Sequence, residues 1–266
     1  MKITARLFCV LLALVAFSGC RAGGETSDKA GANAENLTVS AAVSLKDTFN
    51  EIGALYQAKT GRTVNYNFGS SGALQKQIET GAPVDVFASA GARQMDELAA
   101  KNLIETETRR DFARNTLVLI VPQDSKTNIQ SFADLGKPEV RRVAIGNPKT
   151  VPAGQYAEES LKKTYLFSRV ESKLILAEDV RQVLDYVMRG EVDAGIVYRS
   201  DALAAQDKAR VVAAADETTH QAILYPAAIV KDNGRKQAAQ DFINFVTSAE
   251  GQAILRKYGF AGASEK

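Results

Sequence analysis

The stretch that decides the fold is NYNFGSSGALQKQIETGAPVDVFASA, residues 65–90. Its first part predicts a strand over 64–68, a tight turn over 69–72 and a helix over 73–80 that Gly81 closes. The first N–H groups of a helix have no partner within the helix, and the helix dipole adds about half a positive charge there. Because residues 72–75 contain no Asp or Glu, the sequence predicts an open anion site at this helix start.

Two alternatives for the turn stay open. Ser is a residue type that caps helices, so Ser71 can satisfy the donors of its own helix. The run Gly69-Ser70-Ser71-Gly72-Ala73 also comes close to the nucleophile elbow G-x-S-x-G of serine hydrolases. In that second case Ser71 would need His220, the sole histidine, as its base.

Short apolar runs alternate with amphipathic segments from Leu37 onward, which predicts an α/β architecture with parallel sheets. Strands are expected over 37–42, 64–68, 84–88, 116–121, 143–145, 174–177, 192–198, 210–213 and 225–230. Helices are expected over 44–61, 73–80, 94–101, 155–163, 179–190, 236–247 and 250–258.

Several polar residues and helix starts follow these strands at their carboxyl ends. Ser44 comes after the first strand, where Ser44-x-x-Asp47 also fits a capping box. Residues 151–154 begin another helix without an acid in the turn, and Tyr198 ends a strand. In open α/β sheets this edge is where ligands bind.

Residues 1–20 have the features of a signal peptide, with Lys2 and Arg6 before a short apolar run. The small residues before Cys20 resemble the lipobox of bacterial lipoproteins, which implies cleavage before Cys20 and lipid on its sulfur. Plain secretion is the alternative. Residues 21–36 are polar and small, as in a flexible tether. Since Cys9 lies in the removed peptide, no thiol is left for a disulfide or a cysteine-bound metal.

The composition excludes several classes of function. Lys and Arg number 33 against 31 Asp and Glu, and no basic cluster stands out, so nucleic acid is not an expected partner. The chain contains neither G-x-x-x-x-G-K-[ST] nor a G-x-G-x-x-G after a strand, so no nucleotide cofactor is expected. A single histidine rules out a histidine metal cluster. Any anion must therefore be held by local donors.

Six motifs in order resemble the periplasmic molybdate-binding proteins of molybdate ABC transporters. They are AAVSL (41–45), FGSSG (68–72), GAPVDVF (81–87), VPAGQYA (151–157), AEDVR (177–181) and GIVYRSD (195–201). The resemblance implies a two-lobed periplasmic-binding-protein fold of type II, each lobe a mainly parallel sheet flanked by helices, with the ligand in the cleft. Lobe I is expected over 37–117 and 226–266 and lobe II over 118–225, with crossings near 115–119 and 223–226.

The resemblance also implies five ligand-binding positions, which supply neutral donors: Ser44, Ser71, Ala153, Val180 and Tyr198. Because Gly72 follows Ser71, Ser70 remains an alternative to it. Molybdenum would be bound as its oxyanion, without direct coordination by the protein. A dianion that carries no proton needs only donors, whereas phosphate often keeps a proton that wants an acceptor. Sulfate shares the charge and differs in size.

The expected protein is therefore not an enzyme and has no cofactor. It captures molybdate or tungstate outside the cytoplasm as a lipid-anchored monomer. Its partner is an inner-membrane ABC permease with its ATPase. The alternatives are a lipid-anchored serine hydrolase that uses Ser71 and His220, and a binding protein for another oxyanion such as sulfate.

Overall fold

The computed structural model describes residues 36–205, 207–232 and 234–264. The predicted signal peptide over 1–20 lies outside these ranges, as does the predicted tether apart from its last residue, Asn36. The described chain contains two five-stranded sheets flanked by helices, so the predicted α/β class is confirmed.

The first sheet has the strand order β2-β1-β3-β10-β4. Its strands are β1 (Leu37–Ala42), β2 (Val64–Gly69), β3 (Val86–Ala88), β4 (Arg110–Arg114) and β10 (Leu224–Ile229). β1 runs parallel to β2 and β3, whereas β10 runs antiparallel to both of its neighbours, β3 and β4. One strand in this sheet, β10, thus runs against the rest.

The second sheet has the order β7-β6-β8-β5-β9 and repeats this pattern. Its strands are β5 (Leu117–Pro122), β6 (Val143–Gly146), β7 (Leu174–Ala177), β8 (Ala194–Tyr198) and β9 (Ala209–Ala214). β6 is parallel to β7 and β8, and β5 is antiparallel to β8 and β9. In each sheet the reversed strand is the one that follows a crossing from the other sheet. Both sheets are mainly parallel in this sense, as expected.

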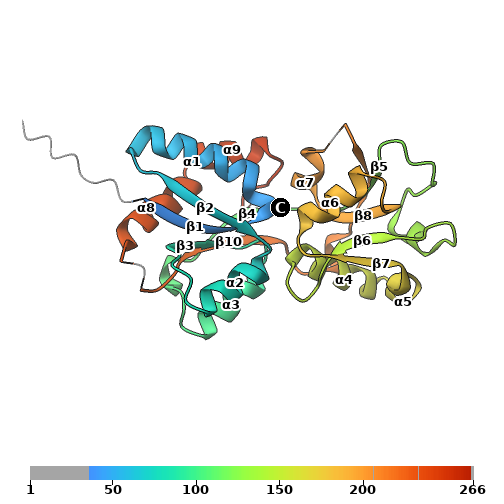
Figure 1. Ribbon diagram of the computed structural model, residues 1–266, viewed down its shortest axis with the longest axis horizontal. Helices are drawn as coiled ribbons and strands as arrows, with labels where there is room; N and C mark the ends of the chain where they lie inside the picture. Colours follow the sequence, from blue (N-terminus) through green and yellow to red (C-terminus); the bar gives the residue numbers. More distant parts are fainter. Residues whose placement is uncertain (1–35, 206, 233, 265–266) are drawn as a thin grey trace, which may run out of the picture. The chain divides into compact units, whose positions relative to one another are not determined.

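Helices cover both faces of each sheet (Figure 1). Those of the first sheet are α1 (Lys46–Thr60), α8 (Lys236–Thr247) and α9 (Ala249–Lys257) on one face and α2 (Ser71–Glu79) and α3 (Ala92–Ala100) on the other. Those of the second sheet are α6 (Val180–Met188) and α7 (Arg199–Leu203) on one face and α4 (Pro152–Lys163) and α5 (Phe167–Val170) on the other. Short 3-10 turns are η1 (Val43–Leu45), η2 (Thr106–Thr108), η3 (Phe132–Gly136), η4 (Glu171–Lys173) and η5 (Glu217–Thr219).

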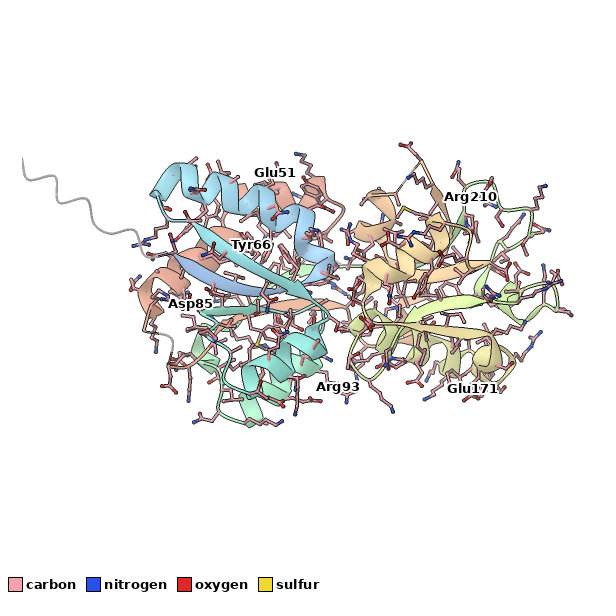
Figure 2. The ribbon with its side chains drawn as sticks, in the orientation of Figure 1. Glu51, Tyr66, Asp85, Arg93, Glu171 and Arg210 are labelled. Carbon is pink, nitrogen blue, oxygen red and sulfur yellow. The ribbon has the colours of Figure 1, made fainter. Side chains whose placement is uncertain are left out.

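The core follows from the apolar periodicity of these elements. Every residue of β5 is buried, as is typical of a wholly apolar strand that is covered on both faces. On the first sheet, Phe49 of α1 packs edge-on against Phe242 of α8 at 6.0 Å between ring centroids. At the rim of the same layer, Glu51 of α1 accepts hydrogen bonds from Lys257 and Tyr258 (Figure 2).

The chain passes between the sheets twice. It leaves the first sheet after Arg114 and joins the second at Leu117, which pairs with Tyr198. It returns after Ala214 and joins the first sheet at Leu224. The two crossing segments touch, because the Asn115 N–H donates to the Ile223 carbonyl at 3.3 Å.

Two details at the expected lobe boundaries differ from the strand pairing. Leu117 was expected in lobe I, and it is a strand residue of the second sheet. Tyr225 was expected in lobe II, yet it pairs with Ala113 in the first sheet. The reason is that an apolar run indicates that its residues form a strand, but it does not indicate with which sheet the strand pairs.

Candidate functional site

The start of α2 is the first part of the site. The helix begins at Ser71, and Ser70 is its N-cap with an extended backbone and no hydrogen bond from its side chain to the helix. The interpretation of Ser71 as a cap is therefore wrong. The Ser71 hydroxyl instead accepts a hydrogen bond from the Ala90 N–H at 3.0 Å, beyond the end of β3. The first turn contains no acidic residue, as the sequence predicted.

Ser44 lies in the 3-10 turn that follows β1, and it is buried. The predicted capping box with Asp47 does not form, because neither η1 nor α1 has a side-chain cap. Both side chains have distant partners instead. The Ser44 hydroxyl lies 3.1 Å from the Tyr225 hydroxyl of β10, and Asp47 pairs with Arg181 of α6 at 2.8 Å.

In the second lobe two helix starts contain the predicted backbone donors, Ala153 and Val180. Ala153 lies in the first turn of α4, directly after Pro152, and is fully buried. A Cβ on Gly154 would come within 1.9 Å of the Gly146 carbonyl oxygen, so glycine is required for α4 to lie this close to β6. Val180 is the first residue of α6, whose N-cap Asp179 accepts a hydrogen bond from Gln182 N–H at 2.9 Å. This cap confirms the predicted role of Asp179.

Tyr198 ends β8 and is 1% exposed. Its hydroxyl donates a hydrogen bond to the Ala90 carbonyl oxygen in the first lobe at 3.0 Å. Burial raises the pKa of this phenol well above its ordinary value, so the hydroxyl keeps its proton. Tyr198 is consequently a neutral donor that reaches across from one lobe to the other.

These residues enclose a small cavity of about 10 Å³ between the two lobes. All five predicted positions line it, together with Ser70; the complete lining is Ala42, Val43, Ser44, Gly69, Ser70, Ser71, Ala90, Val151, Pro152, Ala153, Val180 and Tyr198. This volume corresponds to about one water molecule, far below the roughly 300–1,000 Å³ that organic ligands need. A larger hollow of about 410 Å³ borders α7 and β9, away from the converging helix starts.

One cation and two acids lie beside the cavity. Arg181 follows Val180, and its guanidinium bonds both Asp47 at 2.8 Å and the fully buried Asp201 at 2.7 Å. Burial raises the pKa of Asp201 to about 6, and the Arg181 charge opposes this shift. Because Arg181 is already paired with two acids, attraction for an anion comes mainly from the neutral donors.

Ala90 is the residue that sequence reasoning missed. Its N–H binds Ser71 and its carbonyl accepts from Tyr198, so it joins donors of both lobes. The signal was present, because Ser89 and Ala90 follow a predicted strand at its carboxyl end, where the other site residues lie. Ala90 offers no polar side chain, however, and side chains are what a motif search registers.

The sole histidine lies elsewhere. His220 Nδ1 donates to the Gln221 carbonyl at 2.7 Å, and its ring packs 5.9 Å from the Tyr156 ring. It is not among the residues that line the cavity, and no hydrogen bond found among the described residues joins it to Ser71. The geometry thus provides no support for a Ser71–His220 pair.

No group of three or more His, Cys, Asp or Glu side chains in residues 36–205, 207–232 and 234–264 could hold a metal ion. In the same part of the chain, no helix combines the length and apolar character needed to cross a membrane.

Known proteins resemble this chain in sequence and in architecture. The family model for bacterial extracellular solute-binding proteins matches residues 37–261. The molybdate-binding protein ModA of Escherichia coli (strain K12) is 38% identical over 267 residues, which cover 96% of this chain and 98% of that protein. YvgL of Bacillus subtilis (strain 168), whose name describes an ABC transporter substrate-binding lipoprotein, is 39% identical over 251 residues, which cover 94% and 95% of the two chains.

A solved structure gives the same result for the fold. The periplasmic molybdate-binding protein of Azotobacter vinelandii superposes with a TM-score of 0.76 at 24% sequence identity, covering 85% of this chain and 98% of that one. The predicted two-lobed fold of type II is thereby confirmed. The relatives also confirm the resemblance that the six motifs indicated.

Proposed function

Because this chain belongs to the bacterial extracellular solute-binding proteins, we propose that it captures molybdate outside the cytoplasm and delivers it to an ABC transporter. One observation carries the choice of cargo: hydroxyls and helix starts from both lobes converge on one small cavity that no carboxylate lines. Such a set of donors fits a compact anion that carries no proton.

Each of the five residues has its own part in this proposal. Ser44 and Ser71 offer hydroxyl and N–H groups, Ala153 and Val180 offer N–H groups, and Tyr198 offers its phenol. Ser71 is a better donor than Ser70, because its oxygen already accepts from the Ala90 N–H and its proton is left for the ligand. The Tyr198 hydroxyl has one proton, so it turns from the Ala90 carbonyl when it donates to the anion.

The donor set discriminates among oxyanions by protonation and by size. Hydrogen phosphate carries a proton that needs an acceptor, and the cavity has no carboxylate to accept it. Sulfate matches molybdate in charge, so only the fit of the cavity separates the two. Tungstate is nearly isosteric with molybdate and is expected to bind as well. Molybdenum is held inside its oxyanion, with no direct coordination and no resident cofactor.

Transport, and not catalysis, is the role that the site supports. A serine hydrolase would need a base within hydrogen-bond reach of its nucleophile. Ser71 bonds the Ala90 N–H, and His220 bonds its own neighbour, Gln221. We therefore propose that the protein is not an enzyme.

The proposed setting is the outer face of a membrane. Cys20 carries a lipid in this proposal, which the lipobox-like sequence and the lipoprotein name of YvgL support; the residue lies outside the described ranges. The protein acts as a monomer that serves an inner-membrane permease with its ATPase. Membrane fractions of cells that express Cys20→Ser test the anchor, because the variant should leave the membrane and partition into the aqueous phase.

Calorimetric titration of the protein with molybdate, tungstate, sulfate and phosphate tests the cargo directly. One-to-one binding of molybdate and tungstate, with sulfate and phosphate far weaker, is the expected result. Equal affinities for sulfate and molybdate would refute the assignment. His220→Ala is the matched control, and it should bind molybdate as the original protein does.

A further inference from the structure

Asn115 lies in the first crossing segment, between β4 and β5, and the orientation of its amide is fixed. Its Oδ1 accepts a hydrogen bond from the Thr116 N–H at 2.9 Å. The Nδ2 group therefore faces the other way, toward the Ser200 hydroxyl at 2.8 Å and the Tyr225 hydroxyl at 3.3 Å. Because an amide nitrogen can only donate, the oxygens of both hydroxyls must accept.

The next link is Tyr225, a fully buried residue of β10. Its hydroxyl oxygen accepts from Asn115 and lies 3.1 Å from the Ser44 hydroxyl. Burial raises the pKa of this phenol well above its ordinary value, so it keeps its proton. The Asn115 amide occupies one acceptor site of the Tyr225 oxygen, which favours the arrangement in which the Tyr225 proton is directed to the Ser44 oxygen.

We propose that Asn115 and Tyr225 are positioning residues that orient the Ser44 hydroxyl, so that its proton points into the cavity. The direction runs from the Asn115 amide to the Tyr225 oxygen, from the Tyr225 proton to the Ser44 oxygen, and from the Ser44 proton to the anion. Neither residue lines the cavity itself. The inference rests on the proposed function, because it takes a bound oxyanion as the final acceptor.

This relay has a consequence for selectivity. A serine hydroxyl that is free to rotate can either donate to an unprotonated oxygen or accept from a protonated one. Tyr225 donates to one of the two acceptor sites of the Ser44 oxygen, so the Ser44 proton cannot turn toward Tyr225 and is presented to the ligand. The relay thus favours tetrahedral oxyanions without a proton and disfavours hydrogen phosphate.

The first test removes the link. In Tyr225→Phe the Ser44 hydroxyl is free to rotate, so molybdate affinity at pH 7 should fall about threefold to tenfold. The ratio of molybdate to phosphate affinity, measured by competition on the same preparation, should also fall at least threefold. That ratio does not depend on the fraction of folded protein. Tyr66→Phe is the matched control (Figure 2), because the buried Tyr66 hydroxyl has no hydrogen-bond partner, and it should change neither value.

The second test reverses the relay. Asn115→Asp replaces a donor by an acceptor, so Tyr225 would donate to residue 115 and Ser44 would turn its proton to Tyr225. Molybdate affinity should fall at least tenfold, and Tyr225→Phe in the same chain should bring the loss back toward that of Tyr225→Phe alone. What the double variant loses beyond Tyr225→Phe is the effect of the added charge.

Several outcomes decide between the proposals. If the original protein does not bind molybdate, the proposed function fails. If it does, but Tyr225→Phe lowers molybdate and phosphate affinities by one common factor, or lowers neither, the relay is wrong and the function stands. Independent, additive losses from Asn115→Asp and Tyr225→Phe would also overturn the relay.

Discussion

In the first lobe α2 begins without a side-chain cap, whereas in the second lobe α6 begins at Asp179, which accepts from the Gln182 N–H at 2.9 Å. The N–H of Gly72 in α2 donates instead to the Thr150 carbonyl of the other lobe at 2.8 Å. The first turn of α6 thus has one N–H group bonded to a side chain of its own lobe. The first turn of α2 instead has an N–H group bonded to the other lobe and, in our proposal, further N–H groups bonded to the anion.

A second difference concerns the type of donor. In our proposal the first lobe uses two serine hydroxyls, which a point mutation can delete. The second lobe uses backbone N–H groups at Ala153 and Val180, which survive substitution, and adds one phenol. In this proposal the two lobes bind the same ligand, but the affinity depends more on side chains in the first lobe than in the second.

The largest expected effect comes from deleting side-chain donors. Ser71→Ala and Tyr198→Phe should each weaken molybdate binding by about 1.5–3 kcal/mol, the range for hydrogen bonds to charged groups. Calorimetry gives both values. In the second lobe Tyr198 is the one proposed donor that a substitution can delete. If neither variant changes the affinity for molybdate, the site residues are misassigned.

Gly72→Ala tests how far the first lobe depends on the second. A Cβ at this position would come within 2.5 Å of the Thr150 carbonyl oxygen and 2.7 Å of the Thr150 Cα. Relieving that overlap should cost about 1–3 kcal/mol, or roughly 5- to 150-fold in molybdate affinity. Ala73→Ser, at the exposed next position, should bind normally. If Gly72→Ala also binds normally, contact between the lobes at Thr150 is not needed for capture.

The pH dependence of stability sharpens the electrostatic side of the comparison. Because burial raises the pKa of Asp201 to about 6, the folded protein holds a proton that the unfolded chain has lost between about pH 4 and 6. Stability contributed by this group therefore falls as the pH rises. Between pH 5 and 7 the loss is about 1 kcal/mol.

Urea unfolding of the original protein and Asp201→Asn at both pH values measures this loss. The free energy of unfolding of the variant minus that of the original should be about 1 kcal/mol higher at pH 7 than at pH 5. The reason is that only the original loses stability between these pH values. The pH-independent packing cost of the substitution cancels in that difference. A difference that does not change with pH would mean that Asp201 is ionised throughout.

The smallest expected effect is in the second lobe. Ala153→Ser keeps the backbone N–H that the proposal assigns to the ligand, so it should weaken molybdate binding less than Ser71→Ala does. The same titration that measures Ser71→Ala measures it. A loss as large as that of Ser71→Ala would erase the difference between the lobes.

Much of the fold was predictable because buried strands and helices show a regular spacing of apolar residues in the sequence. The apolar strands and the amphipathic helices were found within a few residues, and α8 was found to the residue. β4 was missed, because its sequence RDFAR has only two buried residues and it is an edge strand. A polar edge strand resembles a loop until its neighbour is known.

The site was predicted less completely, for a physical reason. Ser44 and Ser71 were both recognised at helix starts, but the interpretation of each as a helix cap was wrong. Their hydroxyls form hydrogen bonds with residues far away in sequence, Ser44 with Tyr225 and Ser71 with the Ala90 N–H. Tyr225 lies 181 residues from Ser44 in sequence, and Ala90 has no polar side chain. Local pattern shows where donors gather; it does not show which donors are oriented, because topology decides that.

The late position of the reversed strand β10 in the chain also sets an order of events during synthesis. The second sheet comes from one continuous segment, Leu117 to Ala214, so it can form as soon as that segment is complete. The first sheet cannot, because β10 lies between β3 and β4 and is made last of the strands. Until Leu224–Ile229 arrives, β3 and β4 each present an unpaired edge to other chains. The N-terminal lobe, although synthesised first, is therefore the last to be finished and the more exposed to aggregation on the way.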